Sequence, residues 1–195
     1  MSILPSINAT LLAALLSLAA SVATAGDGAA DRPRATDDAV LRTIEALDVP
    51  RYMGTWFEIA KFPNRFQQKC SAATTATYSL QADGSVQVVN RCRLRDGAMD
   101  EAIGLARQVG PANSAKLRVR FAPAWLSFLP FVWGDYWVVD LDERYQLVAI
   151  SEPRREYLWI LARTPQVAPS DYQALLGRLA RQGFDLARLE PSRQD

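Results

Sequence analysis

The chain has 195 residues, 49% of them hydrophobic and 22% charged, which suits one globular domain better than a disordered chain. Its formal net charge of +1 argues against a nucleic-acid-binding protein that works by releasing counterions. The chain has no histidine, which excludes Ser-His-Asp and Cys-His catalysis, histidine metal sites and His-ligated haem. Two cysteines are too few for a structural zinc site or an iron–sulfur cluster, so we expect no metal and no cofactor.

An uncharged, apolar stretch opens the chain. Residues 1–25 carry no charged side chain and end in Ala23-Thr24-Ala25. An apolar run closed by an Ala-x-Ala site predicts a cleavable signal peptide over residues 1–25. The alternative is an uncleaved anchor, for which the strongly apolar part is short against the ~20 residues of a membrane span. We therefore expect an exported protein of the periplasm or cell envelope, not lipid-anchored through cysteine, because neither cysteine lies near the cleavage point.

The part of the chain after this stretch divides into a leader, a domain and a tail. Residues 26–46 are mostly polar or small and predict a flexible leader, and the domain is expected over residues 47–190, before a tail at 191–195. Short β-type runs separated by turn signals predict eight strands. They span residues 54–62, 73–80, 85–94, 99–109, 115–121, 135–141, 146–151 and 156–163. Eight consecutive antiparallel strands suggest an all-β, up-and-down barrel, which is wide enough to hold one small ligand.

One α-helix is expected after the strands, over residues 170–183. Leucine and tyrosine side chains recur there at helical spacing, Ser170 fits the first position of a capping box, and Gly183 can end the helix. The single apolar face of this helix should pack on the outside of the barrel. A further short strand is predicted over residues 184–189.

Three motifs, in order along the chain, resemble those of the lipocalin family. Gly54-Thr55-Trp56 resembles the Gly-x-Trp signature, and Gly134-Asp135-Tyr136 resembles Thr-Asp-Tyr with Gly in place of Thr. Arg163 resembles the arginine of the third motif. The surrounding residues are most similar to the branch of bacterial lipocalins, apolipoprotein D and plant temperature-induced lipocalins. The resemblance implies that Gly54, Trp56 and Arg163 form a structural plug at the closed end of the barrel, with the arginine stacked on the tryptophan.

The barrel topology implied by the family brings the two cysteines together. Cys70 precedes the second predicted strand and Cys92 lies late in the third, so both belong at the open end of the barrel. Export favours a disulfide between them. The alternative is a free catalytic thiol, as in the prostaglandin D synthases of the same family.

Alternation along the strands predicts which side chains line the barrel. If Trp56 points inward, its strand neighbours at every second position also do, and the family suggests the inward face of the other strands. The predicted ligand-binding residues are Glu58, Ala60, Tyr78, Val88, Asn90, Trp137 and Val139. Among them Glu58 is unusual, because a buried carboxylate must be paired or neutral. Its alternative roles are a solvated charge at a strand edge or a structural bond near the barrel floor.

An uncharged loop over residues 122–134 is the most informative connection between strands. It carries Trp125, Phe128, Phe131 and Trp133 at the predicted mouth of the barrel. Loops are normally polar, so this one needs an apolar partner, which could be the ligand's tail, a membrane surface or another subunit. The alternative is an internal lid that folds over the mouth.

Two arginines in the last mouth loop, Arg154 and Arg155, are candidates for holding a phosphate or carboxylate head group, or are solvated charges. With the apolar barrel they favour a non-catalytic carrier of fatty acids, lysophospholipids or similar amphiphiles, the ligand class that the resemblance implies. The alternatives are an enzyme on the same barrel, for which no catalytic constellation is evident, and a protein-interaction module that uses loop 122–134. We expect the protein to bind a small lipophilic ligand, to contact a membrane peripherally and to bind no nucleic acid. We expect it to be a monomer or weak dimer.

Overall fold

The computed structural model describes residues 40–195. The predicted signal peptide, residues 1–25, and residues 26–39 of the predicted leader lie outside the described residues. The leader prediction is wrong for residues 40–46, because this segment belongs to the fold. Leu41 is only 3% exposed, and the Ile44 N–H donates to the Val138 carbonyl at 3.0 Å. An apolar side chain and a backbone hydrogen bond hold the segment against the barrel wall.

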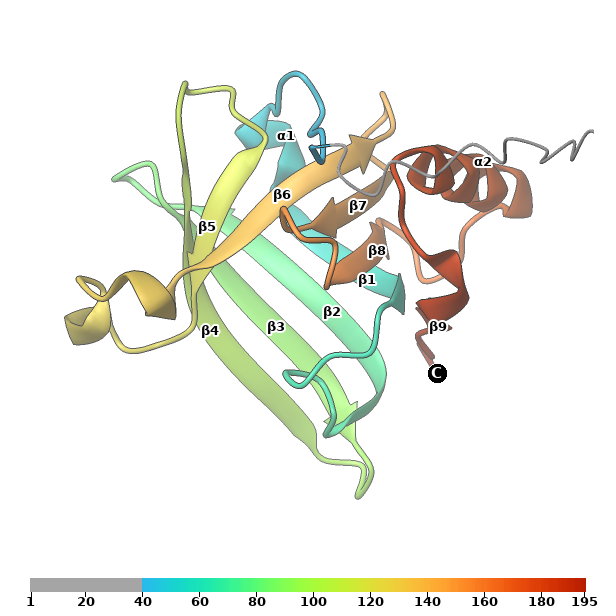
Figure 1. Ribbon diagram of the computed structural model, residues 1–195. Helices are drawn as coiled ribbons and strands as arrows, with labels where there is room; N and C mark the ends of the chain where they lie inside the picture. The colour runs from blue at the N-terminus through green and yellow to red at the C-terminus, as the bar shows by residue number, and fades with distance from the viewer. Residues whose placement is uncertain (1–39) are drawn as a thin grey trace, which may run out of the picture. The chain divides into compact units, whose positions relative to one another are not determined.

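Eight antiparallel strands close into a barrel, as predicted (Figure 1). The strands are β1 (Gly54–Lys61), β2 (Cys70–Leu80), β3 (Val86–Leu94), β4 (Met99–Gln108), β5 (Lys116–Arg120), β6 (Gly134–Leu141), β7 (Leu147–Ser151) and β8 (Leu158–Ala162). Neighbours follow chain order from β2 to β8, and β1 pairs with both β2 and β8. This double pairing of β1 closes the sheet on itself.

A short helix, α1 (Val49–Tyr52), closes one end of the barrel (Figure 1). The Asp48 carboxylate caps it by accepting the Arg51 N–H, and a proline stands in its first turn. Val49 and Tyr52 are buried in the same cluster as the side chains that line the barrel interior. Since β1 starts directly after α1, the end of β1 and the start of β2 lie at the opposite, open end.

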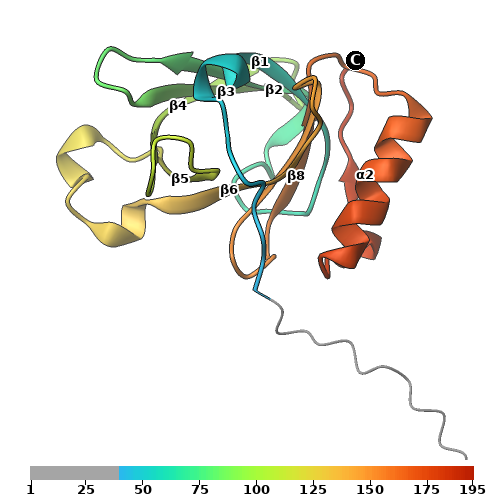
Figure 2. The same cartoon turned by 90° about the horizontal axis from the view of Figure 1, so that it is seen from above.

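Residues 40–195 form one apolar cluster inside the barrel and a second outside it. The outer cluster lies under helix α2 (Pro169–Arg181), whose Leu175 and Leu179 pack against Ile160 and other outward side chains of β6 to β8. Figure 2 shows the helix lying beside the barrel wall. The predicted packing of the helix on the outside is therefore confirmed. Among residues 40–195, no helix has both the length and the apolarity that a membrane span requires.

The boundaries of the C-terminal elements differ from the prediction. Helix α2 begins at Pro169 with Ala168 as N-cap and no side-chain cap, so the capping box at Ser170 is wrong. Proline is suited to the first helical position because its missing N–H would be unpaired there anyway. The predicted strand 184–189 is also wrong: Asp185 caps a 3₁₀ turn, η3 (Leu186–Arg188). The chain becomes extended only afterwards, in β9 (Glu190–Pro191).

The C-terminal residues, predicted as a tail, complete the barrel wall. Strands β1 and β2 pair only from Gly54 to Phe57 along β1, and β9 pairs with Ala60 and Lys61 at the other end of β1. The Ser192 N–H donates to the Ile59 carbonyl at 2.9 Å, and the Arg193 carbonyl accepts the Ala73 N–H at 2.8 Å. Residues 190–195, here called the seam segment, therefore bridge β1 and β2 where the two strands separate.

Candidate ligand-binding site

The floor of the barrel is held by Arg163 and Trp56. The guanidinium carbon of Arg163 lies 3.9 Å from the centre of the Trp56 ring. The same guanidinium donates to the backbone carbonyls of Thr55, Arg51, Tyr52 and Tyr145. Gly54 has φ +95°, and a Cβ there would come within 3.2 Å of the arginine. The predicted plug of Gly54, Trp56 and Arg163 is thus a structural unit that ties β1 and β8 to α1.

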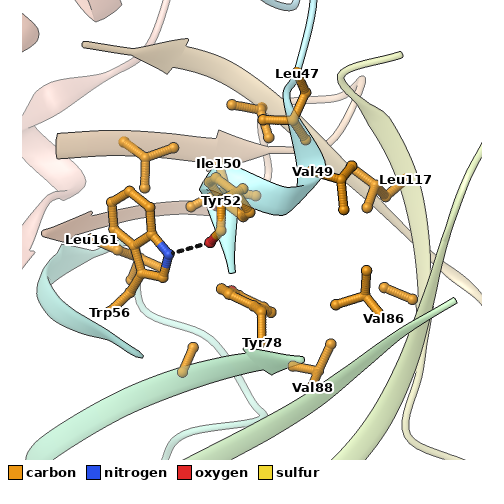
Figure 3. Packing of buried hydrophobic residues seen from close by; sticks show 14 of the residues in the cluster. Leu47, Val49, Tyr52, Trp56, Tyr78, Val86, Val88, Leu117, Ile150 and Leu161 are labelled. Atoms are coloured by element: carbon orange, nitrogen blue, oxygen red, sulfur yellow. Dashed lines mark hydrogen bonds between the residues drawn. The ribbon is translucent and has the colours of Figure 1, made fainter. Parts of the chain in front are cut away.

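Three tyrosines gather directly above this plug. The Tyr136 hydroxyl shares hydrogen bonds with the hydroxyls of Tyr52 at 2.7 Å and Tyr78 at 2.9 Å. Figure 3 shows Tyr52 and Tyr78 beside Trp56, whose Nε1–H donates to the Tyr52 carbonyl at 2.9 Å. Burial raises the pKa of Tyr78 to about 12 and raises the pKa of Tyr52 and Tyr136 well above 10.0. The three hydroxyls therefore keep their protons at neutral pH.

The space beside the tyrosines is nearly filled by apolar side chains. The cavity there has a volume of about 10 Å³, which is about the space that one water needs. It is lined by Leu47, Val49, Tyr52, Met53, Tyr78, Val86, Val88, Ala106, Leu117 and Tyr136. A ligand chain in the barrel would therefore lie above this floor, toward the open end, or would displace these side chains.

Glu58 is buried in the wall between the floor and the open end. It is 2% exposed and accepts hydrogen bonds from the Ser192 hydroxyl, at 2.6 Å, and from the Gln67 amide. Burial raises the pKa of Glu58, although both hydrogen bonds act in the opposite direction. The side-chain oxygen of Gln67, Oε1, accepts a hydrogen bond from the indole N–H of Trp159 at 2.9 Å. Through Gln67, Glu58 connects the seam segment, the β1–β2 loop and β8. Its bonds are structural, as one alternative held, but they lie toward the open end and not near the barrel floor.

Four of the seven predicted lining residues face the barrel interior. Tyr78 and Val88 belong to the interior cluster, and regular pairing along β3 puts Asn90 on the same face as Val88. Glu58 pairs with the inward Leu161.

The other three predicted lining residues are on the outside, so their assignment is wrong. Ala60, Trp137 and Val139 belong to or pack against the outer cluster under α2. In β1, a bulge between Glu58 and Ala60 inserts an extra residue and reverses the alternation. In β6, Tyr136 and Val138 are inward instead. The helix covers the outer face of β6, so both of its faces are apolar and the pattern alone cannot distinguish them.

The predicted disulfide is confirmed. Cys70 and Cys92 are bonded, with their Cα atoms 5.5 Å apart. Cys70 starts β2 and Cys92 lies near the end of β3, so the bond ties two strands together at the open end. No free thiol is left for the catalytic alternative, since these are the two cysteines of the chain.

The β5–β6 loop, residues 121–133, does not fold over the mouth as the lid alternative requires. Its two 3₁₀ turns, η1 (Ala124–Leu126) and η2 (Pro130–Val132), lie to one side of the barrel in Figures 1 and 2. Trp125, Phe128 and Phe131 are 72%, 75% and 79% exposed. Trp133 differs: it is partly buried, and its indole N–H donates to the Ser127 carbonyl at 2.9 Å. Three of the four predicted contact residues are thus available to a partner.

The two head-group candidates have protein partners. Arg154 forms an ion pair with Glu156 at 2.6 Å. The Arg155 Nε–H donates at 2.9 Å to the carbonyl of Gln182, the C-cap residue of α2. Both arginines stand in the β7–β8 loop at the open end of the barrel, but the Arg155 contact is made to the end of α2, outside the barrel. A head-group role for Arg154 or Arg155 stays a prediction.

Sequence reasoning missed Gln67, Trp159 and Tyr136. The sequence does carry a signal for Trp159. This residue precedes Leu161, which pairs with Glu58, by two positions, and it precedes Arg163, which belongs to the plug, by four. Counting back by twos from Arg163 would have placed Trp159 inside the barrel. Gln67 had no comparable signal, since it stands in an irregular loop.

Within residues 40–195, no three Cys, Asp or Glu side chains gather in a way that could hold a metal ion.

Comparison with known proteins identifies the family of this barrel. A family model described as a lipocalin-like domain matches residues 47–194. Temperature-induced lipocalin-1 of Arabidopsis thaliana is 40% identical over 161 residues, covering 82% of this chain and 86% of the relative. Outer membrane lipoprotein Blc of Escherichia coli (strain K12) is 38% identical over 146 residues, covering 74% and 78%. The solved structure of insecticyanin from the tobacco hornworm Manduca sexta superposes with a TM-score of 0.59 at 15% identity, over 78% and 83% of the two chains. The motifs, the closed barrel and these relatives together show that the chain belongs to the lipocalin family.

Proposed function

We propose that this lipocalin binds a fatty acid, lysophospholipid or similar amphiphile in its barrel and carries it without chemical change. Its family is known for binding small hydrophobic ligands. The observation that carries the proposal is the division of the barrel interior into an apolar floor and a more polar upper part. Val86, Val88 and Leu117 line the floor, whereas Asn90 follows Val88 toward the open end on the same inward face of β3. Such a gradient suits a ligand with an apolar chain and a polar head.

A non-catalytic role is supported by the groups inside the barrel. The buried tyrosines keep their protons, and both oxygens of Glu58 accept hydrogen bonds from Ser192 and Gln67. The two cysteines are bonded to each other. A catalytic acid or base would have to come from these tyrosines, Glu58 or the cysteines, all of which already have bonding partners within the protein.

Export and contact with a membrane complete the proposal. One relative is named an outer membrane lipoprotein, and residues 1–25 have the sequence pattern of a signal peptide. We expect this protein in the periplasm or cell envelope, without attachment through a lipidated cysteine. The exposed Trp125, Phe128 and Phe131 would bring the barrel to a lipid surface, where the ligand is taken up or released.

The barrel site can be tested with a fluorescent fatty-acid analogue. Asn90→Trp places a large ring on the inward face of β3 above the floor, and it should lower the affinity for the analogue at least tenfold. The matched control is Gln87→Trp, on the same strand but exposed and facing outward. The control should bind as the unmodified protein does. Equal binding by both folded variants would contradict the barrel site.

A further inference from the structure

A strip of basic side chains runs along the outer wall of the barrel, on β4 and β5. Ala106 and Leu117 belong to the interior cluster, so the residues beside them in sequence, Arg107, Lys116 and Arg118, point outward. Arg107 and Arg118 are direct partners in the β4–β5 ladder. Like charges placed opposite each other are unfavourable for a sheet. The fold itself therefore gains nothing from this pairing.

Acidic side chains offset part of the charge. Asp135 Oδ1 lies 3.9 Å from Arg118 Nε, at the edge of ion-pair distance. The pKa of Asp83 is lowered mainly by hydrogen bonds from Ser85 and also by the charge of Arg107. Arg107 and Lys116 nevertheless remain exposed to solvent, with the Lys116 ammonium 4.3 Å from the centre of the Trp137 ring. The strip is thus a surface that can still attract anions.

The β5–β6 loop lies against the same wall. Arg118 Nη2 donates to the Pro130 carbonyl at 3.4 Å, and the Arg120 guanidinium lies 5.3 Å from the centre of the Trp133 ring. Both arginines are on the outward face of β5, so these contacts show that the loop bends toward the outer wall. In Figures 1 and 2 the loop stands on the side of the barrel away from α2. The end of the loop at residues 130–133, which carries Phe131, therefore adjoins the basic strip, and Trp125 and Phe128 are exposed on the same loop.

We infer that this side of the barrel docks on an anionic lipid bilayer. Trp125, Phe128 and Phe131 enter the interface, while Arg107 and Lys116 face the lipid phosphates. Aromatic side chains are favoured at the boundary between head groups and acyl chains, and each cation close to an anionic surface strengthens attachment. The inference rests on the proposed membrane contact of the loop. It adds the charge of the lipid and a side-on orientation, in which the wall of β4 and β5 meets the membrane.

Vesicle co-sedimentation tests the lipid charge. The protein should bind vesicles of phosphatidylcholine and phosphatidylglycerol more tightly than vesicles of phosphatidylcholine alone, and salt should remove the difference. Arg107→Gln with Lys116→Gln should weaken binding to the anionic vesicles by about fivefold for each charge removed, roughly 25-fold together. The control, Arg42→Gln with Arg181→Gln, removes the same charge from two exposed residues elsewhere. Equal binding to both vesicles, or equal loss in both double variants, would overturn the inference.

Two exposed residues on one strand test the orientation. Met99 and Ile103 are both 57% exposed and lie on the outward face of β4. Met99 is at the open end, whereas Ile103 is four residues nearer to the basic strip. Ile103→Glu should weaken vesicle binding clearly more than Met99→Glu does. The reverse order would mean that the barrel meets the membrane with its mouth, and side-on docking would be wrong.

The results that would disprove the proposed carrier function differ from those that would disprove side-on docking. If the fluorescent fatty acid does not bind in lipid-free solution, the carrier function is wrong even when vesicles still bind the protein. If no vesicle is bound, the membrane contact itself is wrong. A dimer that dissociates when Trp125, Phe128 and Phe131 are changed to Ser, together with absent vesicle binding, would make the loop a protein interface and overturn the inference.

Discussion

The Arg163 guanidinium covers the face of the Trp56 indole, with its central carbon 3.9 Å from the ring centre. The same group donates to carbonyls of α1, β1 and the β6–β7 turn, so one side chain closes the barrel floor. A planar guanidinium can stack and donate in several directions at once, which an ammonium cannot do.

Arg163→Lys should therefore lower the free energy of unfolding by about 2–4 kcal/mol, because stacking and several charge-assisted hydrogen bonds are lost together. Urea denaturation followed by far-UV circular dichroism measures this change. Arg144→Lys, at an exposed arginine of the β6–β7 turn, is the control and should change stability little. A fully stable Arg163→Lys protein would show that the plug is not held by the guanidinium.

The hydroxyl of Tyr136 links the other two buried tyrosines. Tyr136→Phe removes this hydroxyl and leaves those of Tyr52 and Tyr78 without their shared partner. The free energy of unfolding should fall by about 1–3 kcal/mol. Tyr172→Phe, on the partly exposed face of α2, should cost far less. Equal effects of the two substitutions in urea denaturation would argue against the hydroxyl cluster as a stabilising unit.

Glu58 should make stability depend on pH. Its pKa is raised in the folded protein, mainly by burial. The folded state thus binds the Glu58 proton more tightly than the unfolded state does. The protonated carboxyl contributes its full stability below the ordinary pKa of about 4.5, and this contribution is lost as the pH rises through the raised pKa of the folded state. Glu58→Gln cannot ionise, so its melting temperature should rise relative to that of the unmodified protein between acid and neutral pH. A constant difference across that range would refute ionisation of Glu58 as the cause.

The disulfide should add stability at the open end. Cys70 and Cys92 are 22 positions apart, and closing a loop of that length is worth about 3 kcal/mol in the chain-entropy model. Dithiothreitol should lower the urea midpoint accordingly while leaving a folded barrel at low urea. An unchanged midpoint, with thiol titration showing two reduced cysteines, would contradict this expectation.

The sequence predicts the barrel well because each strand is bounded by turn signals that act locally. The order of the strands, the outside helix and the plug all follow from local patterns and the family motifs. The direction of a side chain is harder to predict where a contact between distant residues decides it. The bulge before Ala60 lies where β1 leaves β2 and meets the seam segment, more than 130 positions away in sequence. Gln67 reaches Glu58 and Trp159 from a loop without any repeating pattern.

The seam segment also bears on how the chain can be made. A ribosome releases β1 early and residues 190–195 last, yet the two are hydrogen-bonded neighbours in the finished wall. Until the last residues emerge, the half of β1 nearer the open end has unpaired backbone groups on the side that faces β2. An unpaired strand edge is prone to association with other chains. Newly made protein should therefore need protection from aggregation for the whole time of its synthesis, and barrel closure should be among the final events of folding.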